Sequence, residues 1–175
     1  NFNFKEIKFK KLFSSKNCIT AGGYQSGGRI VPFKDNDLLL TVGDYTSLDL
    51  PQNDQSVNGK IISINTENSN FEIISKGHRN QQGLYFNKEN NFILSTEHGP
   101  RGGDEINLIK VENINKKEIP NYGWPVSSYG EHYEKLIEKD PKIYEKYPLH
   151  KSHSEFGFIE PLTSFVPSIG ISEIV

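Results

Sequence analysis

The amino-acid sequence predicts an all-β fold, and three observations support that prediction. Its apolar runs are short, about four to six residues each, and Gly, Asn, Asp and Pro residues separate them. A helical period is absent from the sequence before Tyr129. Two stretches of strand–turn–strand character also follow one another at a spacing of about 50 residues.

The expected strands follow the apolar runs in chain order. They are residues 30–33, 38–42, 60–64, 71–75, 84–87, 92–96 and 106–111. The connections 34–37 and 87–91 carry Asn and Asp, whose side chains bond to their own backbone in turns. The Lys-, Glu- and Tyr-rich segment 129–147 is compatible with a short helix or an ordered loop. The flanking pieces 2–13 and 159–175 are expected to add further strand-like sequence, which includes the run 171–175.

The two strand–turn–strand stretches form a faint internal repeat. The first copy covers residues 28–44 and the second covers residues 83–97; Phe33 and Phe86 occupy equivalent positions, 86 − 33 = 53 residues apart. A further strand follows each copy. A period near 50 residues with about four short strands per unit is typical of a β-propeller blade, although an ordinary meander or sandwich remains an alternative.

A propeller closes with about 4–8 blades, and this chain holds about two to three. We therefore expect residues 1–175 to form a single, partial β-propeller domain without an internal domain boundary. The chain is then expected to be an excerpt of a longer protein, or copies of it assemble as a homo-oligomer that covers the open blade edges.

The composition excludes several functional classes. With 175 residues, a net charge of −2 and a pI near 6.2, the chain predicts no broad basic surface for nucleic acid. Cys18 is the single cysteine, so it forms no disulfide within the chain and completes no zinc pattern. No apolar run approaches the ~20 residues of a membrane span, and no signal peptide is visible.

Three polar clusters lie next to the expected strands and are the candidate site. They are residues 77–83, residues 96–105 and residues 121–125. Within the first two clusters, a guanidinium, amides, an imidazole and carboxylates occur over about thirty residues, which is difficult to explain as core packing. Loops at strand ends are where a β scaffold presents binding groups.

These clusters resemble the motifs of one family. Residues 77–84 read GHRNQQGL, residues 97–107 read EHGPRGGDEIN and residues 121–125 read NYGWP, with weaker matches at 28–30, 41–44 and 167–169. In order and spacing they are similar to the soluble sugar dehydrogenases that use pyrroloquinoline quinone (PQQ), which include glucose, aldose sugar and sorbosone dehydrogenases. The resemblance runs from about residue 22 to residue 169. It implies a six-bladed propeller with PQQ on one end of the central channel.

The resemblance also implies roles for the first cluster. Arg79 would pair with a carboxylate or quinone oxygen of PQQ, since its planar fork suits bidentate oxygen contacts. Asn80 and Gln82 would offer amide hydrogen bonds nearby. A network of purely structural hydrogen bonds in the channel is the alternative for all three.

The second cluster would hold a calcium ion and the edge of the cofactor. The resemblance implies that the carbonyl oxygens of Gly99 and Pro100 bind Ca²⁺, which prefers oxygen ligands. His98 would touch the cofactor edge, while Asp104 and Glu105 would orient this loop or bind a second ion. Ca²⁺ would polarise a quinone carbonyl so that it accepts hydride from the sugar. Ordinary turn and loop roles are the alternatives.

One position departs from the family pattern. The family's catalytic base is a histidine four residues before the arginine that corresponds to Arg29, and Gln25 stands at that position here. Glutamine cannot act as a general base, and general-base assistance is commonly worth ~10²–10⁴-fold. No histidine precedes His78 in the sequence, so no neighbouring residue replaces it.

Three functional hypotheses follow, and the last is an inert fragment whose function needs the missing blades or an oligomer that supplies them. In the first, the chain belongs to a PQQ-dependent enzyme that oxidises an aldose hydroxyl, with a small sugar as substrate and a periplasmic or secreted location implied by the family. In the second, a propeller without its base binds a sugar or a protein at the same place. Residues 121–125 are expected to form the floor of the site, with Trp124 packed inside. His150 and His153 are expected to lie in a solvated loop rather than in a metal site.

Overall fold

The computed structural model describes residues 8–15, 24–114 and 118–175, and within them two four-stranded antiparallel sheets dominate. The first sheet has the order β1-β2-β3-β4, formed by Gly27–Pro32, Asp37–Val42, Lys60–Asn65 and Phe71–Lys76. The second has the order β5-β6-β7-β8, formed by Asn80–Asn87, Phe92–His98, Asp104–Lys110 and Thr163–Phe165. Each sheet is therefore a meander of the kind expected for a propeller blade.

The seven strands expected from the apolar runs are confirmed, with ends that differ from the expected ones by a few residues. The segment 129–147 holds two short helices, α1 (Glu134–Lys139) and α2 (Ile143–Lys146). Short 3₁₀ turns cover Val111–Asn113 and Ser154–Phe156. The expectation for the flanks was only partly right. Residues 163–165 form β8, whereas residues 171–175 and the described residues 8–15 form no strand.

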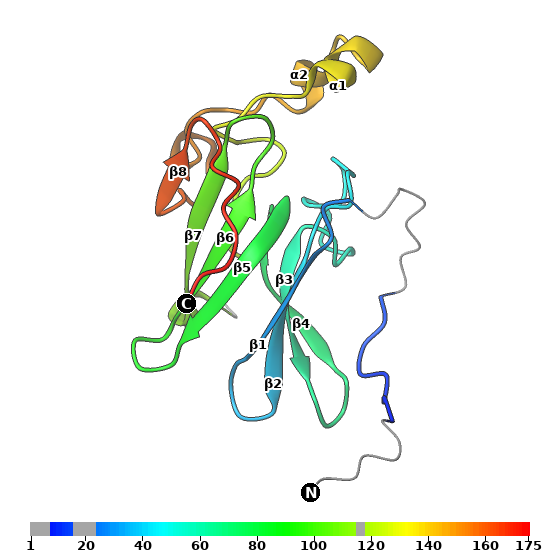
Figure 1. Cartoon of the computed structure of the whole chain (residues 1–175), viewed down its shortest axis with the longest axis vertical. Coiled ribbons are helices and arrows are strands. Elements are labelled where there is room, and N and C mark those ends of the chain that lie inside the picture. Colours follow the sequence, from blue (N-terminus) through cyan, green and yellow to red (C-terminus); the bar gives the residue numbers. More distant parts are fainter. Residues whose placement is uncertain (1–7, 16–23, 115–117) are drawn as a thin grey trace, which may run out of the picture.

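The two sheets share one hydrophobic core. Strands β2 and β3 contribute Leu39 and Ile61 to it, and strands β5 and β6 contribute Leu84 and Ile93. The rings of Phe33 and Phe86, the equivalent positions of the sequence repeat, meet edge to face at 4.8 Å. Figure 1 shows the sheets packed side by side, with β1 and β5 next to one another.

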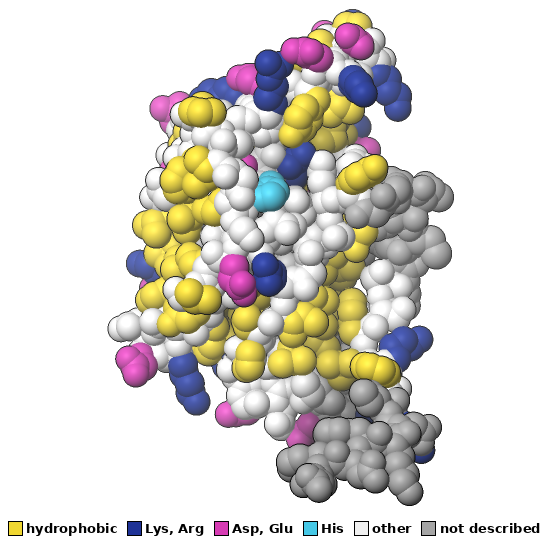
Figure 2. All heavy atoms as spheres, in the orientation of Figure 1, with side chains coloured by type: hydrophobic (Ala, Val, Ile, Leu, Met, Phe, Trp, Pro, Cys, Tyr) yellow, Lys and Arg dark blue, Asp and Glu magenta, His cyan; other side chains and the backbone are white. Residues whose placement is uncertain are grey.

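A long excursion between β7 and β8 folds over one end of the sheets. It carries α1 and α2, which lie beyond the end where β6 stops and β7 starts (Figure 1). Backbone bridges Arg101↔Glu131 and Ser127↔His150 close its base. Figure 2 shows acidic and basic side chains intermixed around this part of the molecule. Among the residues that the structure describes, none of the helices has the length and apolar character needed to cross a membrane.

Lys60 at the start of β3 is fully buried and ties a loop to the sheet. Its Nζ donates hydrogen bonds to the carbonyl oxygens of Leu50 (3.0 Å), Pro51 (2.8 Å) and Asn58 (2.8 Å). Burial lowers its pKa to about 8. This buried lysine thus holds the loop between β2 and β3 to the sheet through three hydrogen bonds.

We expect Lys60→Met to lower the free energy of unfolding by on the order of 3 kcal/mol, because it removes three hydrogen bonds from a buried, charged donor to carbonyl oxygens. Urea unfolding followed by circular dichroism measures the change. Lys110→Met, an exposed lysine at the end of β7, is the matched control and should change stability by less than about 0.5 kcal/mol. Equal stability of the two variants would contradict the prediction.

Candidate functional site

A pocket of about 570 Å³ opens at the end of the sheets near the base of the excursion. Seven of the nine residues predicted from the sequence line it: Gln25, Arg79, Asn80, His98, Gly99, Pro100 and Asp104. The structure does not bring Gln82 and Glu105 to its wall. Tyr24, which the resemblance placed near the channel beside Gln25, also lines the pocket. Lining residues that the sequence did not single out as site residues are Thr46, Tyr133, Ser168 and Gly170.

Arg79 provides the guanidinium of the pocket and is held from several directions. Its Nη1 donates to the carbonyl oxygens of His98 (2.9 Å) and Gly99 (2.5 Å). With the Gln25 amide oxygen turned toward it, Nη2 donates to that oxygen at 2.7 Å. The backbone N–H of Arg79 donates to the Glu97 carboxylate. These bonds orient a buried cation before any ligand arrives.

Two aromatic rings lie near the same guanidinium. The Arg79 Cζ is 5.5 Å from the Trp124 ring centre and 5.9 Å from the Tyr133 ring centre, within the range of cation–π attraction. Trp124 is buried, as predicted, although neither it nor Tyr122 is among the residues that line the pocket. Tyr122 lines a different hollow and donates its hydroxyl to the carbonyl of Leu108 at 2.6 Å.

Asp44 lies behind the pocket wall, bonded to Gln25, and is a further residue that sequence reasoning did not assign to the site. It is fully buried, and its carboxylate accepts bonds from the Gln25 amide (2.6 Å), the Thr46 N–H (2.8 Å) and the Trp124 Nε1–H (2.8 Å). Burial raises its pKa to about 7, against the opposing charge of Arg79. The only sequence signal was its place in the weak match at residues 41–44, directly after a strand.

Gln25 bridges the two charged groups, and its backbone is shaped for that. Its φ of 58° lies in the left-handed region, which non-glycine residues rarely adopt. Residue 43 is glycine because a Cβ there would come within 1.9 Å of the Gln25 carbonyl oxygen. The Gln25 amide therefore separates the Asp44 carboxylate from the Arg79 guanidinium with one hydrogen bond to each.

Asn80 and Gln82 have different places, although both lie on β5. Asn80 lines the pocket, and its Oδ1 accepts bonds from the Gln82 side chain (2.8 Å) and the Gly27 N–H (3.2 Å). The register of β5 against β6 shifts between Gln81 and Gly83, so Gln82 sits in a bulge. Gln82 supports Asn80 instead of facing the pocket.

His98 and Asp104 hold the C-terminal segment against the pocket. The Asp104 carboxylate accepts bonds from the Ser168 hydroxyl (3.0 Å) and from the N–H groups of Ile169 (3.1 Å), Gly170 (2.8 Å) and Ile171 (3.2 Å). The His98 Nε2 lies 2.5 Å from the carbonyl oxygen of Ile171. Both oxygens of Asp104 are thus engaged within the chain.

Gly99 and Pro100 form a tight turn with their carbonyl oxygens already in use. The Gly99 oxygen accepts from Arg79, and the Pro100 oxygen accepts from the Gly103 N–H at 3.2 Å. A Cβ at Gly99 would come within 1.7 Å of the Gly103 oxygen, so only glycine allows this turn. The described part of the chain contains no cluster of three or more His, Cys, Asp or Glu side chains arranged to bind a metal.

Glu105 points into a separate, buried network. One carboxylate oxygen accepts from Asn107 Nδ2 at 3.4 Å, and the other is 3.7 Å from His153 Nε2. Burial, together with the charge of Glu97, raises its pKa. The prediction of a solvated loop was wrong for His153, which is buried beside Glu105 and packs against Tyr129 at 5.3 Å.

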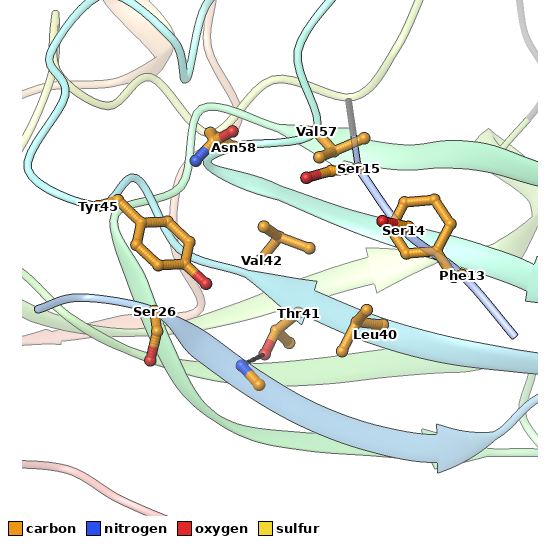
Figure 3. A pocket seen from close by; sticks show the side chains of 11 residues that line it. Phe13, Ser14, Ser15, Ser26, Leu40, Thr41, Val42, Tyr45, Val57 and Asn58 are labelled. Carbon is orange, nitrogen blue, oxygen red and sulfur yellow. Dashed lines mark hydrogen bonds between the residues drawn. The ribbon is translucent and has the colours of Figure 1, made fainter. Parts of the chain in front are cut away.

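A second hollow of about 390 Å³ lies between the N-terminal segment and the first sheet. Figure 3 shows Phe13 on one side of it and Tyr45 on the other, with Val42 of β2 between them and Thr41 below. None of the predicted site residues lines this hollow. The pocket around Arg79 is therefore the one that the sequence motifs identify.

The fold and the site together thus define a class of protein: a partial β-propeller with a polar pocket at one end of its blades. The family model described as Glucose / Sorbosone dehydrogenase matches residues 3–175. The chain belongs to this family.

Named relatives agree with that assignment. The chain is 29% identical to an aldose sugar dehydrogenase of Escherichia coli over 142 residues, which cover 74% of the chain and 36% of the relative. It is 34% identical to quinoprotein glucose dehydrogenase B of Acinetobacter calcoaceticus over 128 residues, 56% of the chain and 25% of the relative. An uncharacterized protein of Synechocystis is 32% identical over 174 residues, with coverages of 86% and 38%. The chain therefore spans well under half the length of these relatives.

Solved structures are similar in fold as well. A structure described as glucose dehydrogenase superposes with a TM-score of 0.70 at 28% identity, covering 94% of this chain and 45% of that one. The PQQ-bound aldose sugar dehydrogenase of Streptomyces coelicolor gives a TM-score of 0.53 at 25% identity, with coverages of 81% and 36%. These likenesses confirm the all-β, propeller-type fold and the partial coverage of it.

Proposed function

We propose that this chain forms part of a PQQ-dependent sugar dehydrogenase and that the pocket around Arg79 contacts the cofactor. The observation that supports this most is the position of a buried, pre-oriented guanidinium beside six other residues of the family motifs. Pockets that combine few, well-placed polar groups with aromatic walls are typical of cofactor sites.

The residues present fit an acidic, planar cofactor. PQQ is a fused-ring ortho-quinone with three carboxylates, and Arg79 offers a guanidinium beside the Tyr133 ring. Both oxygens of the neighbouring Asp104 carboxylate are already bonded to the C-terminal segment through four hydrogen bonds. Asn80 adds an amide to the wall. When bound, PQQ supplies the hydride acceptor for sugar oxidation.

For calcium, the chain offers few ligands by itself. Each carbonyl oxygen has two lone pairs, so Gly99 and Pro100 keep one each for a cation. Ca²⁺ takes 6–8 oxygen ligands, and the remainder would come from the cofactor and from water. We therefore propose that Ca²⁺ binds together with PQQ and only weakly without it.

A binding module is the second candidate function, and Gln25 favours it. The Gln25 amide occupies the family's base position and has both of its polar atoms bonded, to Asp44 and Arg79. An amide has no lone pair basic enough to accept a proton from a sugar hydroxyl. A protein that keeps the pocket but lacks the base would hold a sugar or a protein partner without oxidising it.

The surface is consistent with a molecule that has further partners. Leu162, Val166 and Ile169 are exposed hydrophobic side chains around β8. Such side chains are what a propeller exposes when neighbouring blades are missing. We propose that more blades of the same protein, or a second copy of this chain, cover them, and that the protein acts in the periplasm or outside the cell.

Titration of the full chain with PQQ, with and without Ca²⁺, tests the proposal. Trp124 is the single tryptophan and lies beside Arg79, so its fluorescence reports on the pocket, and calorimetry gives an independent value. We expect saturable, Ca²⁺-dependent binding that Arg79→Ala weakens by about 100-fold or more, because it removes a buried charge partner.

Arg101→Ala is the matched control, since Arg101 is exposed and pairs with Glu134 outside the pocket. Its PQQ affinity should stay within about threefold of the original chain. Arg79→Lys keeps the charge but not the fork, and should bind with intermediate affinity. Absence of PQQ binding by the unmodified chain well above micromolar concentrations would reject the cofactor proposal and leave the binding module.

A further inference from the structure

Tyr133 belongs to the excursion between β7 and β8 and lines the pocket from there. Of the described residues 105–167, Tyr133 alone lines the pocket. Its ring centre lies 5.9 Å from the Arg79 guanidinium, and 47% of the residue is exposed. Within the described residues its hydroxyl has no hydrogen-bond partner. A tyrosine that served only packing would be buried further and would bond its hydroxyl.

The residues before and after Tyr133 are fixed to the body of the protein. Glu131 exchanges two backbone hydrogen bonds with Arg101, at 3.0 and 2.8 Å. His132 is buried, its Nε2 lies 2.7 Å from the Tyr147 carbonyl oxygen, and its ring packs against Tyr144 at 4.7 Å. The position of Tyr133 is therefore determined on its N-terminal side by an anchored pair of residues.

The helices that follow are anchored as well. Tyr133 immediately precedes α1, and its carbonyl accepts the N–H of Leu136 at 2.8 Å. At the far end of the excursion, Lys146 and Tyr147 both bond to Asp49 in the first sheet's loop, at 2.8 and 2.5 Å. Contacts to both sheets' loops thus hold one half-exposed ring at the pocket wall.

The other groups of the wall select the kind of ligand that this ring faces. Beside the charged Arg79 and Asp104, the wall holds the neutral polar residues Gln25, Thr46, Asn80 and Ser168, which come from four different segments. A pyranose matches such a wall because it presents hydroxyls around its rim and C–H groups on its faces. The negative face of an aromatic ring attracts those C–H groups, as it attracts the positive edge of another ring.

We infer that Tyr133 is a sugar-recognition residue of this pocket, whose ring stacks on a pyranose face while its free hydroxyl bonds to the sugar rim. The inference rests on the proposed function because it assigns the same pocket to a sugar. It adds the residue that distinguishes a ring sugar from an open-chain polyol. Tyr133 acts through ligand contact and takes no part in proton transfer.

The test compares D-glucose with sorbitol, a polyol that lacks the ring face, by calorimetry on the full chain with and without PQQ and Ca²⁺. We expect Tyr133→Ala to weaken glucose binding by about tenfold and to bring the glucose-to-sorbitol preference close to one. Tyr133→Phe keeps the ring and should retain that preference. Tyr85→Ala, a partly exposed tyrosine of β5 that lies outside the pocket lining, is the control.

The outcomes separate this inference from the proposed function. If PQQ binds and depends on Arg79, but glucose binding and ring preference survive Tyr133→Ala, the inference fails alone. If PQQ does not bind while glucose binds in a Tyr133-dependent way, the cofactor proposal fails alone. If neither ligand binds the unmodified chain, both are overturned. Circular dichroism of each variant excludes loss of folding as the cause.

Discussion

Replacing Gln25 with histidine is expected to raise PQQ-dependent sugar oxidation by about 10²–10⁴-fold, the usual contribution of a general base. The pocket is already arranged for that side chain. Asp44 would accept the N–H of one ring nitrogen where it now accepts the Gln25 amide at 2.6 Å, which leaves the lone pair on the other nitrogen. The left-handed backbone at residue 25 also accepts histidine better than most residues.

The measurement is dye reduction by the full chain with glucose, PQQ and Ca²⁺, after PQQ binding has been verified for each variant. Gln55→His is the control, because it makes the same exchange at an exposed glutamine outside the pocket wall. Its activity should equal that of the original chain. A Gln25→His variant that binds PQQ normally and gains no activity would favour the binding module.

The second large effect concerns pH and comes from Asp44. Its pKa is 3.8 in an ordinary environment and about 7 in the folded protein, because burial disfavours the charged form. The folded state therefore keeps a proton that the unfolded chain releases above about pH 4. Stability from this group is complete below pH 4 and is lost as pH rises to about 7, by on the order of 2–4 kcal/mol.

Urea unfolding at a series of pH values between 4 and 8 measures this loss as the difference between the original chain and Asp44→Asn. The variant should lack the decrease, although its baseline stability falls by about 1–3 kcal/mol because Trp124 Nε1 loses its acceptor. Glu105, whose pKa is also raised, adds a decrease of the same sign. Glu105→Gln should therefore keep the Asp44 step. Identical pH profiles for Asp44→Asn and the original chain would contradict the assignment.

The strands were predictable because their signal is local. Short apolar runs between turn residues identified seven of the eight strands, and the 53-residue repeat correctly paired the two sheets. The site residues Arg79, Asn80, His98 and Asp104 could be predicted for the same reason, since each lies at or beside a strand end. Residues at strand ends share one edge of a sheet, so their convergence follows from topology.

Gln82 and Glu105, which the sequence motifs grouped with these residues, do not line the pocket, and strand geometry explains both cases. Successive side chains of a strand point to opposite faces, so Asp104 reaches the pocket while the next residue, Glu105, enters the network with His153. Gln82 shares the parity of Asn80, but the bulge after Gln81 interrupts the alternation. A sequence pattern gives neither the face of a strand nor the place of a bulge without its pairing partner.

The sequence by itself determined the fold class, the family and most of the pocket wall, because strand periodicity and motif spacing are properties of neighbouring residues. Only the tertiary structure decided that Asp44 and Tyr133 belong to the site, since they are 35 and 54 residues from Arg79 (79 − 44 and 133 − 79) and no periodicity relates them to it. Packing decided their properties as well. Burial raises the pKa of Asp44, and the anchored excursion brings the Tyr133 ring to the guanidinium. Solvent exclusion and long-range contact arise when the sheets pack, and no short stretch of sequence contains them.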